Sequence, residues 1–134
     1  MSNQKQPLVL KKTLTLSTYN YFRTHLKMLA IIFPSLQMTD GETNVLAGFM
    51  EIEDKVLYGF STEARQVVKN KLGLGAAGLS NYLRQLKDKK LIVNVIVDNK
   101  VKLVIRKELY PNKDKQAYLF KLSNNDQEII SNEK

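Results

Sequence analysis

Residues 72–92 read LGLGAAGLSNYLRQLKDKKLI. Three glycines in this stretch follow the dinucleotide-binding pattern G-x-G-x-x-G: Gly73, Gly75 and Gly78. An acid, Asp98, follows about 20 residues later, as that fingerprint requires. A dinucleotide loop must leave a buried strand and present a helix N-terminus to the pyrophosphate. Here the preceding residues 63–72, EARQVVKNKL, are charged and have helical spacing, so the context argues against a cofactor site.

The same glycines fit a helix, a short turn and a second helix. Gly73 stands where a left-handed residue can end a helix at about Leu72. The next helix is predicted over about 76–90, begun by Gly75 or the small residues beside it. Gly78 then allows close packing against a neighbour, so the glycines serve turning and packing.

Three helices are predicted before residue 73. The first carries an apolar stripe and ends at Pro34; its members are Tyr19, Phe22, Leu26, Leu29 and Phe33. The second opens with Thr39 and Glu42 at capping-box spacing and buries Val45, Leu46, Phe49 and Met50. The third is capped by Ser61 or Thr62 and turns inward Ala64, Val67, Val68 and Leu72.

The remainder of the chain has the composition of strands. Residues 91–110 and 116–122 are rich in Val, Ile, Tyr and Phe, with turn signals at Asp98-Asn99 and Pro111-Asn112. They predict two or three strands of a hairpin or small antiparallel sheet, with Tyr118 and Phe120 covering a helical core. The expected fold class is therefore α+β, with helices first and a basic hairpin last.

The chain is predicted to form a single domain, residues 17–122, because its 134 residues are close to the usual domain size. An extended arm, residues 1–16, precedes it, and a polar tail, residues 123–134, follows it. Cysteine is absent, and no apolar run approaches the ~18 residues of a membrane span. We expect a cytoplasmic protein, or a virion protein if it serves in assembly, without a signal peptide or membrane anchor.

The formal net charge is +8, and its placement is uneven. Eleven Lys or Arg residues stand against four acids between Arg84 and Lys121. A concentrated basic surface favours double-stranded DNA or an acidic protein face as partner, although a lysine-rich solubilising surface has the same composition.

Helices, a helix-turn-helix and a basic hairpin just after LKDKKLI (86–92) resemble the winged helix-turn-helix superfamily, roughly in the MarR-like style, over about 39–122. The resemblance implies a dimeric DNA-binding regulator. The chain departs from the family at Lys90, where a glycine is common, and in residues 97–116, which lack the compact Asp-Arg-Arg type of wing tip. These departures put small-molecule sensing in doubt.

Residues 78–92 followed by AYLFKL (117–122) are also similar to small winged-helix proteins of tailed bacteriophages of gut bacteria. That resemblance implies either a phage regulator or a structural protein of the virion, such as a neck or ring component of the head-tail connector. As a structural protein, the chain would form an oligomer and would use the winged-helix fold for protein–protein contacts and not for DNA.

The DNA hypothesis assigns roles to polar side chains on the predicted helix 76–90 and on the hairpin. The base-reading candidates are Asn81, Arg84 and Gln85. The phosphate-binding candidates are Ser80, Lys87, Lys100, Lys102, Arg106, Lys107, Lys113 and Lys115. Asp88, on the same helix face, would repel phosphate, and any soluble amphipathic helix has a polar outer face.

No catalytic, cofactor or metal site is predicted. His25 is the only histidine and has no cysteine, second histidine or clustered acid near it in sequence. Glu51, Glu53 and Asp54 form a small acidic group for which a solvated helix end is the default. The expected protein is non-enzymatic and binds no cofactor.

Overall fold

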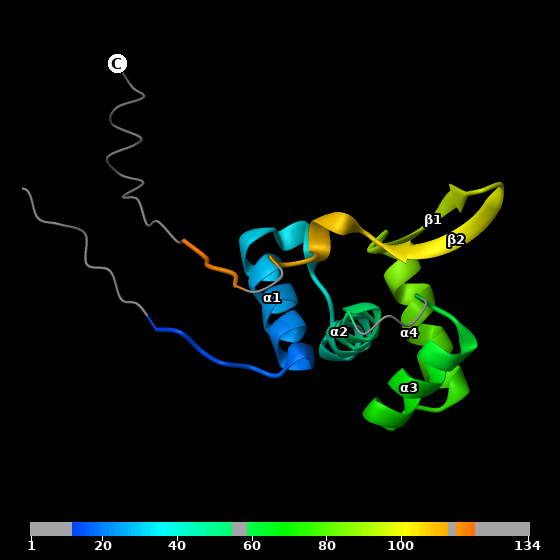
Figure 1. The fold of residues 1–134 in the computed structure, drawn as a ribbon, viewed down its shortest axis with the longest axis horizontal. Coiled ribbons are helices and arrows are strands. Elements are labelled where there is room, and N and C mark those ends of the chain that lie inside the picture. The colour runs from blue at the N-terminus through cyan, green and yellow to red at the C-terminus, as the bar shows by residue number, and fades with distance from the viewer. Residues whose placement is uncertain (1–11, 55–58, 113–114, 120–134) are drawn as a thin grey trace, which may run out of the picture.

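The computed structural model describes residues 12–54, 59–112 and 115–119. Four helices come first: α1 (Thr18–Ile32), α2 (Asp40–Asp54), α3 (Thr62–Leu72) and α4 (Ala76–Asp88). An antiparallel hairpin of β1 (Ile92–Val97) and β2 (Lys100–Ile105) follows, and short 3-10 turns occupy Pro34–Leu36 and Lys107–Leu109. The predicted α+β class, with helices before a hairpin, is confirmed (Figure 1).

Side-chain caps begin three of the helices; the caps of α2 and α3 were predicted, and the cap of α1 at Ser17 was not. The Ser17 side chain accepts the Asn20 N–H at the start of α1, and Ser61 does the same for Ala64 in α3. Before α2, Glu42 accepts the Thr39 N–H through Oε1 at 2.8 Å. The reciprocal bond, from the Glu42 N–H to Thr39 Oγ1, is 3.2 Å long, which completes the capping box.

Left-handed residues end two of the helices. Gly73 closes α3 with φ of 66°, as its position predicted. Lys90 has φ of 61°, so α4 stops at Asp88, earlier than the expected end at about residue 90. The left-handed region favours glycine, which is a physical reason why a glycine is common at the position that Lys90 occupies here.

The core is built around α2, which lies between α1 on one side and α3 and α4 on the other (Figure 1). Its buried apolar residues are Val45, Leu46, Ala47, Phe49, Met50 and Ile52. Two residues predicted to point inward do not. Val67 is 44% exposed because Val68 occupies the inner side of α3, and Phe33 is 52% exposed because it lies beyond the last turn of α1.

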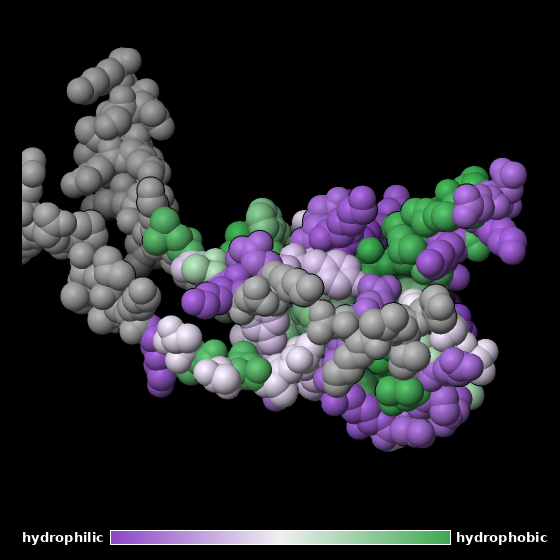
Figure 2. Space-filling view, viewed as in Figure 1, coloured by the Kyte–Doolittle hydropathy of each residue, from purple (hydrophilic) through white to green (hydrophobic). Residues whose placement is uncertain are grey.

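The hairpin projects from the helical body (Figure 1). Its two-residue turn, Asp98-Asn99, has φ of 52° and 63°, as the mirror-image type I′ turn requires. Ile92 pairs with Ile105 in the buried base, whereas the pair Ile96 and Val101, nearer the turn, is exposed. Figure 2 shows apolar side chains reaching the surface along the hairpin.

Two expected extended segments form no strand where they are described. Residues 12–17 and 115–119 form no ladder with another described segment, and the rest of both segments, including Phe120, lies outside the described residues. In place of a backbone ladder, Tyr118 contacts α1 through its hydroxyl, 2.6 Å from Nδ1 of His25. No helix in the described parts of the chain is long and apolar enough to cross a membrane.

Candidate nucleic-acid interface

The outer face of α4 presents polar side chains because its apolar residues follow one stripe. Leu79, Leu83 and Leu86 are buried against the core. Asn81 and Arg84, three residues apart, are both exposed and make no hydrogen bond or ion pair with another described residue. Their side chains are therefore available to a ligand.

The other α4 candidates differ in exposure. Ser80 and Lys87 are exposed, while Gln85 is half-buried and less accessible than the helical wheel suggested. Asp88 is also exposed, in the last turn of α4 next to Lys87. Asp88 therefore lies at the C-terminal end of the outer face of α4, and the first turn of this helix contains no acidic residue.

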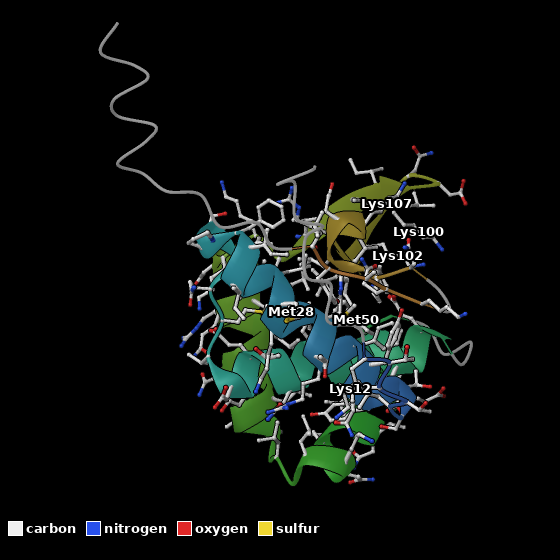
Figure 3. The ribbon with its side chains drawn as sticks, turned by 90° about the vertical axis from the view of Figure 1, so that its left-hand side faces the viewer. Lys12, Met28, Met50, Lys100, Lys102 and Lys107 are labelled. Atoms are coloured by element: carbon white, nitrogen blue, oxygen red, sulfur yellow. The ribbon has the colours of Figure 1, made fainter. Side chains whose placement is uncertain are left out.

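Lysines on the hairpin lie on β2. Lys100 and Lys102 are exposed and share one face of the strand, because alternate residues of a strand point the same way. Figure 3 shows them in the same part of the molecule as Lys107, which follows β2, and away from Lys12. Figure 1 shows, however, that the turn holding Lys107 lies at the base of the hairpin, whereas Lys100 begins β2 next to the hairpin turn, so only Lys100 and Lys102 lie together.

The remaining candidates are engaged or distant. Arg106 pairs with Glu108, with 3.3 Å between Nε and Oε2. Lys115 belongs to the segment that Tyr118 fastens to α1, at the opposite side of the molecule from the hairpin (Figure 1). The structure therefore does not bring Lys115 together with α4, and Lys113 lies outside the described residues.

Sequence reasoning missed a contact that positions α4. Lys89, just after the helix, places Nζ 2.5 Å from Oε1 of Glu42, whose side chain is only 2% exposed. Burial by itself raises the pKa of Glu42, but hydrogen bonds from Lys89 and Thr39 outweigh it and hold that pKa below its usual value. The C-terminal end of α4 is thus tied to the start of α2.

A second polar contact ties the return of the chain after the hairpin to α2. The Tyr110 hydroxyl donates a hydrogen bond to Oε2 of Glu53. Burial, together with this carboxylate, raises the pKa of Tyr110. Glu53 is therefore a structural acceptor.

His25 is buried beneath Tyr118. The residue is 4% exposed, and Nε2 has no partner among the described residues. Burial lowers the pKa of His25, and burial also raises the pKa of Tyr118 to about 12. No group of three His, Cys, Asp or Glu residues that could hold a metal ion occurs within the described ranges.

Sequence reasoning also missed the exposed aliphatic residues of the hairpin. Ile96 is 76% exposed, Val101 71% and Val97 48%. The available signal was the run IVNVIV, which lacks the apolar and polar alternation of a strand with one solvated face.

Comparison of the chain with protein families, curated proteins and solved structures found no match.

Proposed function

We propose that the protein is a non-enzymatic winged-helix protein that binds double-stranded DNA, with α4 in the major groove. The arrangement of α3, a three-residue turn, α4 and a hairpin is compatible with a winged-helix layout. The observation that carries the proposal is the pair Asn81 and Arg84, exposed on one α4 face without intramolecular partners among the described residues.

In this proposal each side chain has a chemical role. Arg84 donates two hydrogen bonds to a guanine edge, and Asn81 makes a paired contact with adenine. Ser80 and Lys87 bind the phosphates beside the groove, while Lys100 and Lys102 bind the backbone from β2. A dimer would read two half-sites, which suits a phage or bacterial transcriptional regulator.

The test is selection of bound duplexes from a random DNA library, followed by fluorescence anisotropy on the enriched site at several salt concentrations. Arg84→Ala should weaken binding to that site by about 1–3 kcal/mol and relax the sequence preference at one base pair. Lys102→Ala should weaken all duplexes similarly and reduce the salt slope by about one. Lys115→Ala, on the α1 side, is the matched charge control and should change neither.

Two results would contradict the proposal. One is a library that enriches no sequence at near-physiological salt. The other is an equal effect of Arg84→Ala and Lys115→Ala, because the loss would then follow net charge and not the α4 face.

A structural assembly protein is the second candidate, for example a neck or ring component of a tailed-phage virion. Exposed apolar side chains favour it: Ile31 and Phe33 at the end of α1 are 65% and 52% exposed, in addition to the hairpin residues. Asp98 at the hairpin turn also opposes close approach to phosphate. Ring formation in solution without DNA, seen by sedimentation velocity and electron microscopy, would support this candidate over the first.

A further inference from the structure

One face of the hairpin carries two exposed lysines beside valines. Lys100, Lys102 and Val104 alternate along β2, so their side chains point to the same side of the sheet. On β1, Val97 pairs with Lys100 and Val95 pairs with Lys102. These five residues form the lysine face of the hairpin. Neither lysine makes a hydrogen bond or ion pair with another described residue, so the face suits a ligand that is both acidic and aliphatic.

The tail of the chain has that composition. Residues 123–134 lie outside the described residues and read SNNDQEIISNEK, with three acids against one lysine in a chain whose net charge is +8. Asp126, Glu128 and Ile130 alternate in the tail as the two lysines and Val104 do in β2. Alternate residues of an extended chain are about 7 Å apart on one side. Two acids and an isoleucine can therefore match the spacing of two lysines and a valine.

We propose that residues 126–130 of one copy of the chain bind in extended form across the lysine face of a second copy, parallel to β2. In this contact Asp126 meets Lys100, and Glu128 meets Lys102. Both are charge-assisted pairs, which are stronger than neutral hydrogen bonds. The net negative tail of each copy thus binds to the basic hairpin of another.

The apolar residue of the tail decides its direction. In the parallel direction Ile130 lies over the half-buried Val104, whereas in the opposite direction it would lie over the turn at Asp98. The tail crosses the face and does not extend the sheet at β2, because the connection between α2 and α3 approaches that edge. A Cβ added to Gly59 would lie 3.7 Å from the carbonyl oxygen of Leu103.

The tail of the same copy is too short for this contact. Leu119 belongs to the segment that Tyr118 fastens to α1, at the opposite side of the molecule from the hairpin (Figure 1). Asp126 follows Leu119 by seven residues, which span at most about 25 Å when fully extended. A domain of about 100 residues is about 33 Å across, and the hairpin projects beyond the helical body. The occupant is therefore the tail of a second copy.

The contact does not rest on the DNA-binding proposal, because it uses no residue of α4. It does use Lys100 and Lys102, so the tail and a DNA backbone would compete for β2. The test therefore contains no DNA and measures the association of the full chain by sedimentation equilibrium.

Two charge-reversed variants provide the central test. The hairpin variant combines Lys100→Glu with Lys102→Glu, and the tail variant combines Asp126→Lys with Glu128→Lys. Each variant alone should raise the dissociation constant at least about tenfold, because like charges then meet at the contact. An equimolar mixture of the two should associate like wild type, since each variant carries the charges that the other requires.

Matched controls separate this contact from net charge and from general stickiness. Lys12→Glu combined with Lys27→Glu changes the net charge as much as the hairpin variant does, on exposed residues before and within α1, and should leave association unchanged. Ile130→Ser should weaken association more than Ile129→Ser, because alternate side chains of an extended tail point away from the face. Circular dichroism checks that every variant remains folded.

Three results would overturn the proposal. The first is a wild-type chain that stays monomeric at all concentrations tested, and the second is an association that both charge-reversed variants leave intact. The third is rescue in a chain that carries all four reversals but not in the mixture, because the tail would then bind its own hairpin. A chain that selects no DNA sequence but passes the mixing test would remove the DNA-binding proposal and leave the tail contact standing.

Discussion

Lys89 and Glu42 form the shortest ion pair among the described residues, with Nζ 2.5 Å from Oε1. The pair joins the end of α4 to the first turn of α2, and Lys89 also donates to the carbonyl oxygen of Gln37 at 3.2 Å. Glu42 is buried while Lys89 remains 40% exposed, so the carboxylate depends on its hydrogen bonds more than the ammonium does.

Lys89→Met should therefore lower the free energy of unfolding by about 1–3 kcal/mol, because it leaves the buried Glu42 carboxylate with only the Thr39 N–H. Lys87→Met, on the exposed side of α4, is the matched control and should change stability by less than about 0.5 kcal/mol. Urea denaturation of both variants measures the difference. Equal losses would show that the ion pair contributes nothing beyond lysine's own packing.

The Glu42 carboxylate should make stability depend on acid. Its pKa is lower in the folded chain than the ordinary value of 4.5, so its contribution is fully present above pH 4.5 and is lost as pH falls through the folded pKa. Glu42→Gln should be less stable at pH 7 and should lose less stability than wild type between pH 5 and 3. Denaturation midpoints across that range test this, and parallel curves would contradict it.

Gly73 and Gly75 provide a comparison within one turn. Gly73→Ala should destabilise the protein by about 1 kcal/mol, because its φ of 66° is strained for any residue with a Cβ. Gly75 has φ of −82° and no atom within 4 Å of an added Cβ, so alanine fits there without strain, and Gly75→Ala should cost less than Gly73→Ala, about 0.5 kcal/mol for a poorer N-cap. Thermal and urea unfolding of the two variants measure the contrast. A larger loss for Gly75→Ala would mean that this glycine has a role other than turning.

His25 should reduce stability below neutral pH. Its pKa is lowered by burial from the ordinary 6.5, so the unfolded chain takes up its proton first and stability falls as pH drops below about 6.5. The decline should stop below the folded pKa. His25→Leu should remove this part of the pH dependence, whereas Tyr118→Phe, which removes only the hydroxyl partner, should retain it. The chain has one histidine, so its NMR titration gives the folded pKa directly.

Asp88 should weaken DNA binding if α4 lies in the major groove. Asp88→Asn removes the one carboxylate of the α4 outer face and should tighten binding about twofold to fivefold at low salt, with less effect at high salt. Anisotropy titrations at two ionic strengths measure this. An unchanged affinity at low salt would place the C-terminal end of α4 away from the phosphates.

Local sequence features predicted the helices well because their causes are local. The caps at Ser17, Ser61 and Thr39 lie within three residues of their partners, and Gly73 ends α3 by its own backbone freedom. The strand expected at 116–122 is absent from its described part, residues 116–119, for the opposite reason. β-forming composition favours a strand only if a neighbouring edge is available, and Tyr118 is held instead by His25, 93 residues earlier.

The residues of the candidate site also separate into those that local sequence patterns placed correctly and those whose position depends on tertiary contacts. Helical periodicity placed Asn81 and Arg84 on the outer face, but it could not separate Gln85, half-buried by its surroundings, from them. The basic cluster in the sequence likewise could not reveal that Lys89 is committed to Glu42, or that Lys115 lies beside α1.

The sequence by itself determined the order of helices and hairpin, the turn at Gly73 and the type I′ turn at Asp98-Asn99, because φ preference, capping and apolar spacing act within a few residues. Only the tertiary structure decided that Ile96 and Val101 are exposed and that Glu42 meets Lys89. Those outcomes depend on how α2 packs against its neighbours, and such contacts join residues far apart in the chain.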